Sequence, residues 1–107
     1  MLQMVEKIFR RYGSAMLLYT AGGEEEFLGF LQPFNSRNRQ RLKTERTVLG
    51  EVPNGVYVLI LPAALQVAIG DSVGLAQKTY KVYRLENAAY GDEILYQWGL
   101  CTKEGGA

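Results

Sequence analysis

Apolar residues at the start of the chain are spaced three and four positions apart, while most of the charged residues between them fall elsewhere on a helical wheel. This spacing predicts one amphipathic helix over residues 1–12, ended by Gly13 as its C′ residue. A helix of about three turns is marginally stable alone, so its apolar face needs a surface on its own subunit or on a neighbouring chain. Both surfaces remain possible from the sequence. The expected face consists of Leu2, Val5, Ile8 and Phe9.

The most apolar run of the chain is rich in β-branched residues and covers residues 56–62, between Pro53-Asn54-Gly55 and a final Pro62. Such a run predicts a strand with both faces buried. It is too short to cross a membrane as a helix, which needs about 20 apolar residues.

Alternating apolar positions and glycine-rich turns predict the other strands. A first hairpin is expected over residues 14–33, with strands at 15–19 and 25–32 joined by Ala21-Gly22-Gly23. Asn54-Gly55 between apolar runs predicts a second hairpin of residues 47–52 with 56–61. After a turn at Gly70-Asp71, strands are expected at 72–75, 79–85 and 93–102, with a turn at 76–78 and a loop at 86–89. In the last strand, the alternation places Trp98 on the face expected to anchor the core.

These elements indicate a mainly β fold, a small antiparallel β-barrel or sandwich of about six strands with one N-terminal amphipathic helix and a long polar loop. The length of 107 residues suits one domain. Its expected parts are a helix (1–13), a first hairpin (14–33), a long basic loop (34–46), the remaining strands (47–102) and a flexible tail (103–107).

The loop at 34–46 carries five cations and one acidic residue. In an extended chain the first four cations would project from one edge, which suits a phosphate backbone or an acidic partner surface. A solvated connection between hairpins is the plain alternative. The acidic triplet at residues 24–26, expected at the tip of the first hairpin, is either a solvated turn or a complement to these cations. The candidate contact residues are Arg37, Arg39, Arg41, Lys43, Arg46, Glu24, Glu25 and Glu26.

Candidate chemistry is sparse. The chain has no histidine, which removes the usual proton shuttle and the commonest zinc ligand. The single cysteine, Cys101, has no base partner in the pattern and is expected to be a buried structural residue. We therefore expect no catalytic residues, no cofactor and no metal. Twelve basic and eleven acidic residues give a net charge of +1, so direct contact with nucleic acid or a membrane is not expected from overall charge. One cysteine and the absence of a signal-peptide pattern suit a reducing cytoplasm.

Several segments in order resemble the small head-tail connector proteins of tailed bacteriophages and prophages, also called head-tail joining, head closure or neck proteins. The resemblance spans about residues 14–102 and is carried by Leu31-Gln32-Pro33, the strand at 57–62, Ile69-Gly70-Asp71-Ser72-Val73, and Lys78-Thr79-Tyr80-Lys81-Val82. It implies a small barrel or sandwich without catalysis, in a ring between portal and tail. Residues 34–46 match the family's long loop, which reaches into neighbouring subunits.

The resemblance also implies portal, adaptor or tail proteins as partners, with a ring homo-oligomer when assembled and a monomer allowed when free. It implies the bacterial host cytoplasm during assembly and the neck or tail of the virion afterwards. The N-terminal helix is more prominent than in a typical connector, which leaves a tail-completion role open. The alternative function is a monomeric barrel that binds single-stranded nucleic acid, using the same basic loop and tyrosines as stacking platforms.

Overall fold

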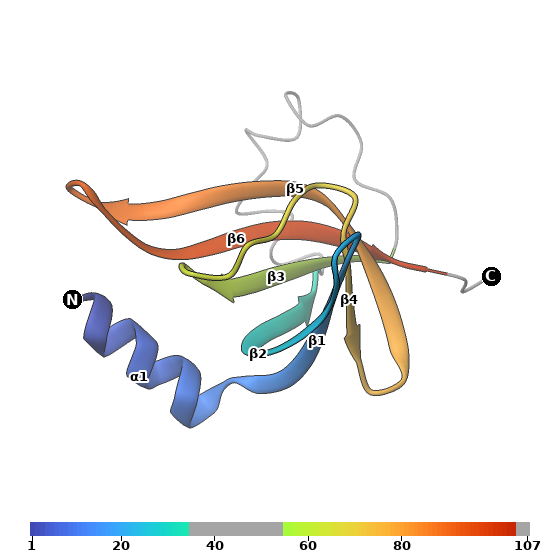
Figure 1. Ribbon diagram of the computed structural model, residues 1–107, viewed down its shortest axis with the longest axis horizontal. Coiled ribbons are helices and arrows are strands. Elements are labelled where there is room, and N and C mark those ends of the chain that lie inside the picture. The colour runs from blue at the N-terminus through green and yellow to red at the C-terminus, as the bar shows by residue number, and fades with distance from the viewer. Residues whose placement is uncertain (35–54, 105–107) are drawn as a thin grey trace.

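The computed structural model describes residues 1–34 and 55–104, which contain one helix and six strands (Figure 1). The strands form a closed antiparallel barrel in the order β1-β2-β3-β6-β5-β4, which confirms the predicted mainly β fold and selects the barrel over the sandwich. The elements are α1 (Leu2–Tyr12), β1 (Ser14–Thr20), β2 (Gly23–Pro33), β3 (Val56–Pro62), β4 (Ser72–Leu75), β5 (Lys78–Tyr90) and β6 (Glu93–Lys103).

The predicted first hairpin is present, with Ser14 opposite Gly29 and Thr20 opposite Gly23. Its second strand begins at Gly23, whose φ of +135° is a glycine conformation. The acidic triplet Glu24–Glu26 therefore lies within β2, paired with β1, and its expected place at the hairpin tip is wrong. The tip is formed by Ala21 and Gly22.

Gly13 follows α1 as predicted, with an extended backbone (φ −69°, ψ 152°) in place of the left-handed one that glycines at helix ends commonly adopt. Glycine is required there for space, because a Cβ would lie 2.5 Å from the Phe9 carbonyl oxygen and 3.1 Å from Leu28 Cβ. The chain can thus turn directly from α1 into β1 while lying against β2.

The apolar strand β3 pairs with β2 on one side and β6 on the other. Leu59 and Leu61 are fully buried inside the barrel, and Val58 packs on a smaller cluster with Phe34 and Leu100. The prediction that both faces of this strand are covered is therefore confirmed. Its expected hairpin partner, residues 47–52, lies outside the described residues.

After β3, the chain crosses to β4 through an irregular connection that ends in the predicted turn. Gly70 has a φ of +100°, and the Asp71 carboxylate accepts a hydrogen bond from the Ala68 backbone N–H (2.8 Å). β4 has the bounds that the sequence predicts.

The prediction of a loop at residues 86–89 is wrong, because β5 continues through these residues to Tyr90. Glu86, Asn87 and the alanines after them favour strands only weakly, but each pairs with a residue of β6. Register shifts at Val82/Arg84 and Ala88/Ala89 adjust the long ladder, and Gly91 (φ +63°) supplies the turn that follows. The result is a hairpin that extends beyond the barrel, beside the N-terminus of α1 (Figure 1).

Trp98 is only half-buried and is absent from the main core, so its expected role as core anchor is wrong. Its indole ring lies 5.4 Å from the Arg84 guanidinium carbon. The opposite face of β6 points inward and carries Gln97 and Cys101. Gln97 is buried because its side-chain amide donates hydrogen bonds to the carbonyl oxygens of Pro62 (2.9 Å) and Leu65 (2.8 Å).

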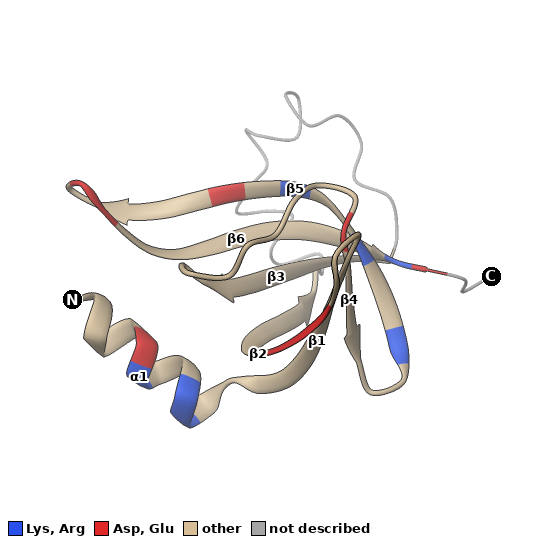
Figure 2. Cartoon of the chain, in the orientation of Figure 1, with Lys and Arg blue, Asp and Glu red and all other residues tan. Residues whose placement is uncertain are grey.

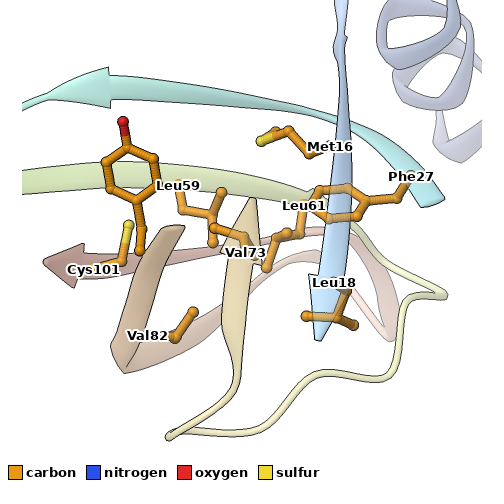
Figure 3. Packing of buried hydrophobic residues seen from close by; sticks show 9 residues of the cluster. Met16, Leu18, Phe27, Leu59, Leu61, Val73, Val82 and Cys101 are labelled. Atoms are coloured by element: carbon orange, nitrogen blue, oxygen red, sulfur yellow. The ribbon is translucent and has the colours of Figure 1, made fainter. Parts of the chain in front are cut away.

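The barrel interior is filled by side chains from all six strands (Figure 3). The ring of Tyr80 packs edge-on against Tyr57, with centroids 4.8 Å apart. This cluster consists of Met16, Leu18, Phe27, Leu59, Leu61, Val73, Tyr80, Val82 and Cys101.

We expect Gly29→Ala to destabilise the barrel. A Cβ at this position would lie 2.6 Å from the Ile60 carbonyl oxygen and 2.9 Å from Met16 Cε, so β2 and β3 would have to separate. Overpacking of this kind costs about 1–3 kcal/mol and should lower the midpoint of urea unfolding. Gly22→Ala is the matched control, because its Cβ would meet only Thr20 Oγ1 at 3.7 Å. Equal midpoints for the two variants would contradict the packing described.

The two-residue turn between β4 and β5 stores backbone strain. Ala76 and Gln77 both have left-handed backbones, with φ of 53° and 66°, which non-glycine residues adopt at a cost of about 1–3 kcal/mol each. Two left-handed residues in succession suit Asn-Gly in a hairpin of this type. We expect the double substitution Ala76→Asn and Gln77→Gly to stabilise the protein by about 1–2 kcal/mol in urea unfolding. An unchanged or lower midpoint would show that the turn is not strained.

Candidate interaction surfaces

The helix α1 lies on its own barrel, against β2 and β6. Phe9 is buried, with its ring centroid 5.4 Å from that of Phe30 on β2. At the other end of the helix, the Leu2 backbone N–H donates a hydrogen bond to the Glu93 carboxylate (3.2 Å). Leu2 and Val5 are half-buried. The sequence left two surfaces open for the predicted helix face. Three of the four residues of this face, Leu2, Val5 and Phe9, are covered by their own subunit.

The fourth residue, Ile8, belongs to a second apolar row on the same helix. This row, called here the helix stripe, is solvent-exposed: Met1 61%, Met4 68%, Ile8 49% and Tyr12 65%. The spacing of three and four positions puts these side chains along one side of the helix, next to the buried side. The sequence contained this signal, since the apolar residues of α1 cover more of the helical wheel than one buried face needs.

Figure 2 shows cations along α1, and two of them lie beside the helix stripe by their spacing in the sequence. Lys7 and Arg11 follow Met4 and Ile8 by three positions, and the Arg11 guanidinium lies 5.6 Å from the Tyr12 ring centroid. Arg10 lies on the other side of the helix. There it lines a groove of about 290 Å³ together with Glu6, residues 62–64 and Leu95.

The acidic triplet on β2 does not present one face. Glu25 is opposite Leu18, whose side chain is inside the barrel, so Glu25 points toward the barrel mouth. Glu24 and Glu26 share the outer face of β2. All three are exposed, and within residues 1–34 and 55–104 the one ion pair is Arg84 with Glu86 at 3.6 Å. Within the described part of the chain no cation forms an ion pair with these carboxylates, so they are available to a partner.

A groove of about 420 Å³ lies where the barrel closes, between β1 and the β4–β5 hairpin. β1 pairs with β4 only from Leu17 to Tyr19, so residues 14–16 have no ladder partner on this side among the described strands. Glu26 and Lys78 are among the residues that line the groove.

The predicted basic contact residues lie outside the described part of the chain. They are Arg37, Arg39, Arg41, Lys43 and Arg46.

The described residues contain no group of three or more side chains that could hold a metal ion, and no described helix is long and apolar enough to cross a membrane. Cys101 is fully buried, and its thiol donates a weak hydrogen bond to the Tyr57 carbonyl oxygen at 3.8 Å. Burial raises the pKa of this thiol to about 12, so it stays protonated and unreactive in the folded protein. It is the structural cysteine that the sequence predicts.

Comparison of the chain with models of known protein families, with curated proteins and with solved structures finds no match.

We expect the buried thiol to make stability depend on pH above neutrality. The pKa of Cys101 rises from 9.0 to about 12 on folding, so between these values the unfolded chain loses a proton that the folded chain keeps. The contribution of this group is therefore complete below about pH 9 and decreases as the pH rises toward 12. Urea unfolding at pH 8 and pH 10 should show a larger loss of stability for the natural chain than for Cys101→Ala. Equal losses would contradict the burial of the thiol.

Proposed function

We propose that the protein is a structural assembly subunit of the phage type, a head-tail connector or tail-completion protein that acts through protein contacts in a ring. The observation that carries this proposal is the exposed outer face of β2, where Glu24 and Glu26 form no ion pair with a described residue. The same chain supplies a segment, residues 34–46, with five cations. Opposite charges on two different surfaces of one chain suit contact between neighbouring copies.

A contact between two different surfaces is heterologous, and repeated contacts of this kind form a ring when the rotation between copies closes. The proposed order is that the basic segment of one subunit meets Glu24 and Glu26 of the next. Portal, adaptor or tail proteins would bind the two faces of the ring. A net charge of +1 allows such complementary patches to meet without strong repulsion between whole subunits.

The alternative, a monomeric barrel that binds single-stranded nucleic acid, draws support from Tyr83 and Lys81, which are exposed on the outer face of β5. An aromatic ring next to a cation is a usable stacking platform. Against it, this barrel has six antiparallel strands, while the oligonucleotide-binding fold has five. The first proposal is therefore preferred.

Carbodiimide coupling, which joins a lysine amine directly to a touching carboxylate, tests the ring contact. In a concentrated mixture of unlabelled and ¹⁵N-labelled protein, we expect mixed-label peptides that join Lys43 to Glu24 or Glu26. The triple variant Arg37→Glu, Arg39→Glu and Arg41→Glu should lose these peptides and remain folded, because it replaces attraction by repulsion.

The matched control is Arg10→Glu, Lys81→Glu and Lys103→Glu, which makes the same charge change at exposed positions of α1, β5 and β6. It should keep the coupling. Coupling that persists in the variant with Arg37, Arg39 and Arg41 replaced by glutamate would contradict the ring contact. Coupling that joins residues of one molecule only would contradict it as well. A labelled oligonucleotide titrated at low salt serves as the second arm. Binding that weakens steeply with salt in the natural chain, together with absent coupling, would favour the alternative.

A further inference from the structure

The helix stripe is an apolar surface with no cover among the described residues. Met4, Ile8 and Tyr12 are between 49% and 68% exposed, although α1 already buries Phe9 against the barrel. A helix of 11 residues is about 16 Å long, so the stripe runs the whole length of α1. Apolar side chains gathered in this way favour removal from water.

Charges of opposite sign lie at the two ends of α1. The acidic end lies at the start of α1, where the Glu93 carboxylate accepts the hydrogen bond from the Leu2 N–H and Asp92 occupies the adjoining turn. The basic end is the last turn, where Arg11 borders Tyr12. Figure 2 shows the acidic hairpin tip beside the N-terminal end of α1 and the cations farther along the helix.

A surface that is acidic at one end, apolar in the middle and basic at the other is complementary to itself after a rotation of 180°. We propose that two copies of this chain dimerise by packing their helix stripes antiparallel about a two-fold axis. Ile8 and Met4 of one copy then contact those of the other, and each Arg11 meets the Asp92 and Glu93 of its partner. The antiparallel order also places each positive helix N-terminus near the negative C-terminus of the other helix.

This dimer uses a different surface from the proposed ring contact and stands whether or not the ring forms. In a ring, it would join two subunits, or two rings, face to face. Because few side chains take part, the contact is small, and self-association with a dissociation constant of about 10 µM is expected.

Sedimentation equilibrium of the full chain over about 1–300 µM tests the apolar part of the contact. The average mass should rise to that of a dimer in the natural protein. Ile8→Glu should remain monomeric over the range, while Ile69→Glu, the same change at a residue that is 65% exposed on the β3–β4 connection, should dimerise normally. A natural chain that stays monomeric throughout, or equal behaviour of the two variants, would overturn the proposal.

Charge exchange tests the two-fold geometry. Arg11→Glu and Asp92→Lys should each weaken the homodimer at least about tenfold, because like charges then face each other. An equimolar mixture of these two variants should regain dimerisation, since the carboxylate introduced in one variant meets the ammonium group introduced in the other. Arg10→Glu, on the groove side of the same helical turn, should leave the dimer unchanged.

Failure of the mixture to recover would overturn the antiparallel arrangement. Binding of the chain to vesicles of anionic lipid is measured as well. A chain that is monomeric at all concentrations and binds these vesicles through Ile8 would assign the stripe to a lipid surface and contradict the proposal. If the Lys43 coupling described above is not found, the proposed dimer is unaffected, so the two proposals can fail separately.

Discussion

Closure of the barrel depends on a contact of three residue pairs between β1 and β4, from Leu17 opposite Gly74 to Tyr19 opposite Ser72. Leu18 and Val73 form the middle pair, and both are almost completely buried in the core. This short ladder ties the first strand of the chain to a strand that is distant in sequence, so the six strands share one interior. Long-range pairing of this kind is stabilised mainly by the apolar side chains that it brings together. The turn at Ala76-Gln77, with two left-handed residues in succession, lies next to this ladder at the end of the β4–β5 hairpin.

The closed barrel positions the surfaces that carry the proposed function. Because β1 is fixed by its neighbours, α1 must leave the barrel at Gly13 and return along β2 and β6, where Phe9 packs on Phe30. The β5–β6 hairpin is long enough to place Glu93 at the start of this helix. The helix stripe and the outer carboxylates of β2 thus lie on elements that the closed barrel positions, and the described residues hold no cluster of side chains that could bind a metal.

The sequence predicted those features that local signals determine. Glycine pairs and the Gly-Asp step identified the turns, and alternation identified β4 to the residue. It did not predict the extension of β5, because the weak strand formers at residues 86–89 are held by their pairing with β6. The sequence also favoured an inward position for Trp98, which is wrong. Both faces of β6 carry apolar residues, and alternation alone does not say which of the two faces lies against the core. The hydrogen bonds that satisfy Gln97 inside the barrel come from residues 62 and 65, which are distant in sequence. The predicted helix face was correct for Leu2, Val5 and Phe9, whereas Ile8 is exposed and belongs to the helix stripe.

We propose that this chain acts as a closed barrel whose surfaces bind other protein subunits. Amide hydrogen exchange of the full chain at low and high protein concentration tests it most directly. We expect added protection at high concentration in α1 and in residues 23–26 of β2, with no change in the buried strands around Leu59 and Val73. Exchange that is identical at both concentrations along the whole chain would contradict the claim that these surfaces associate.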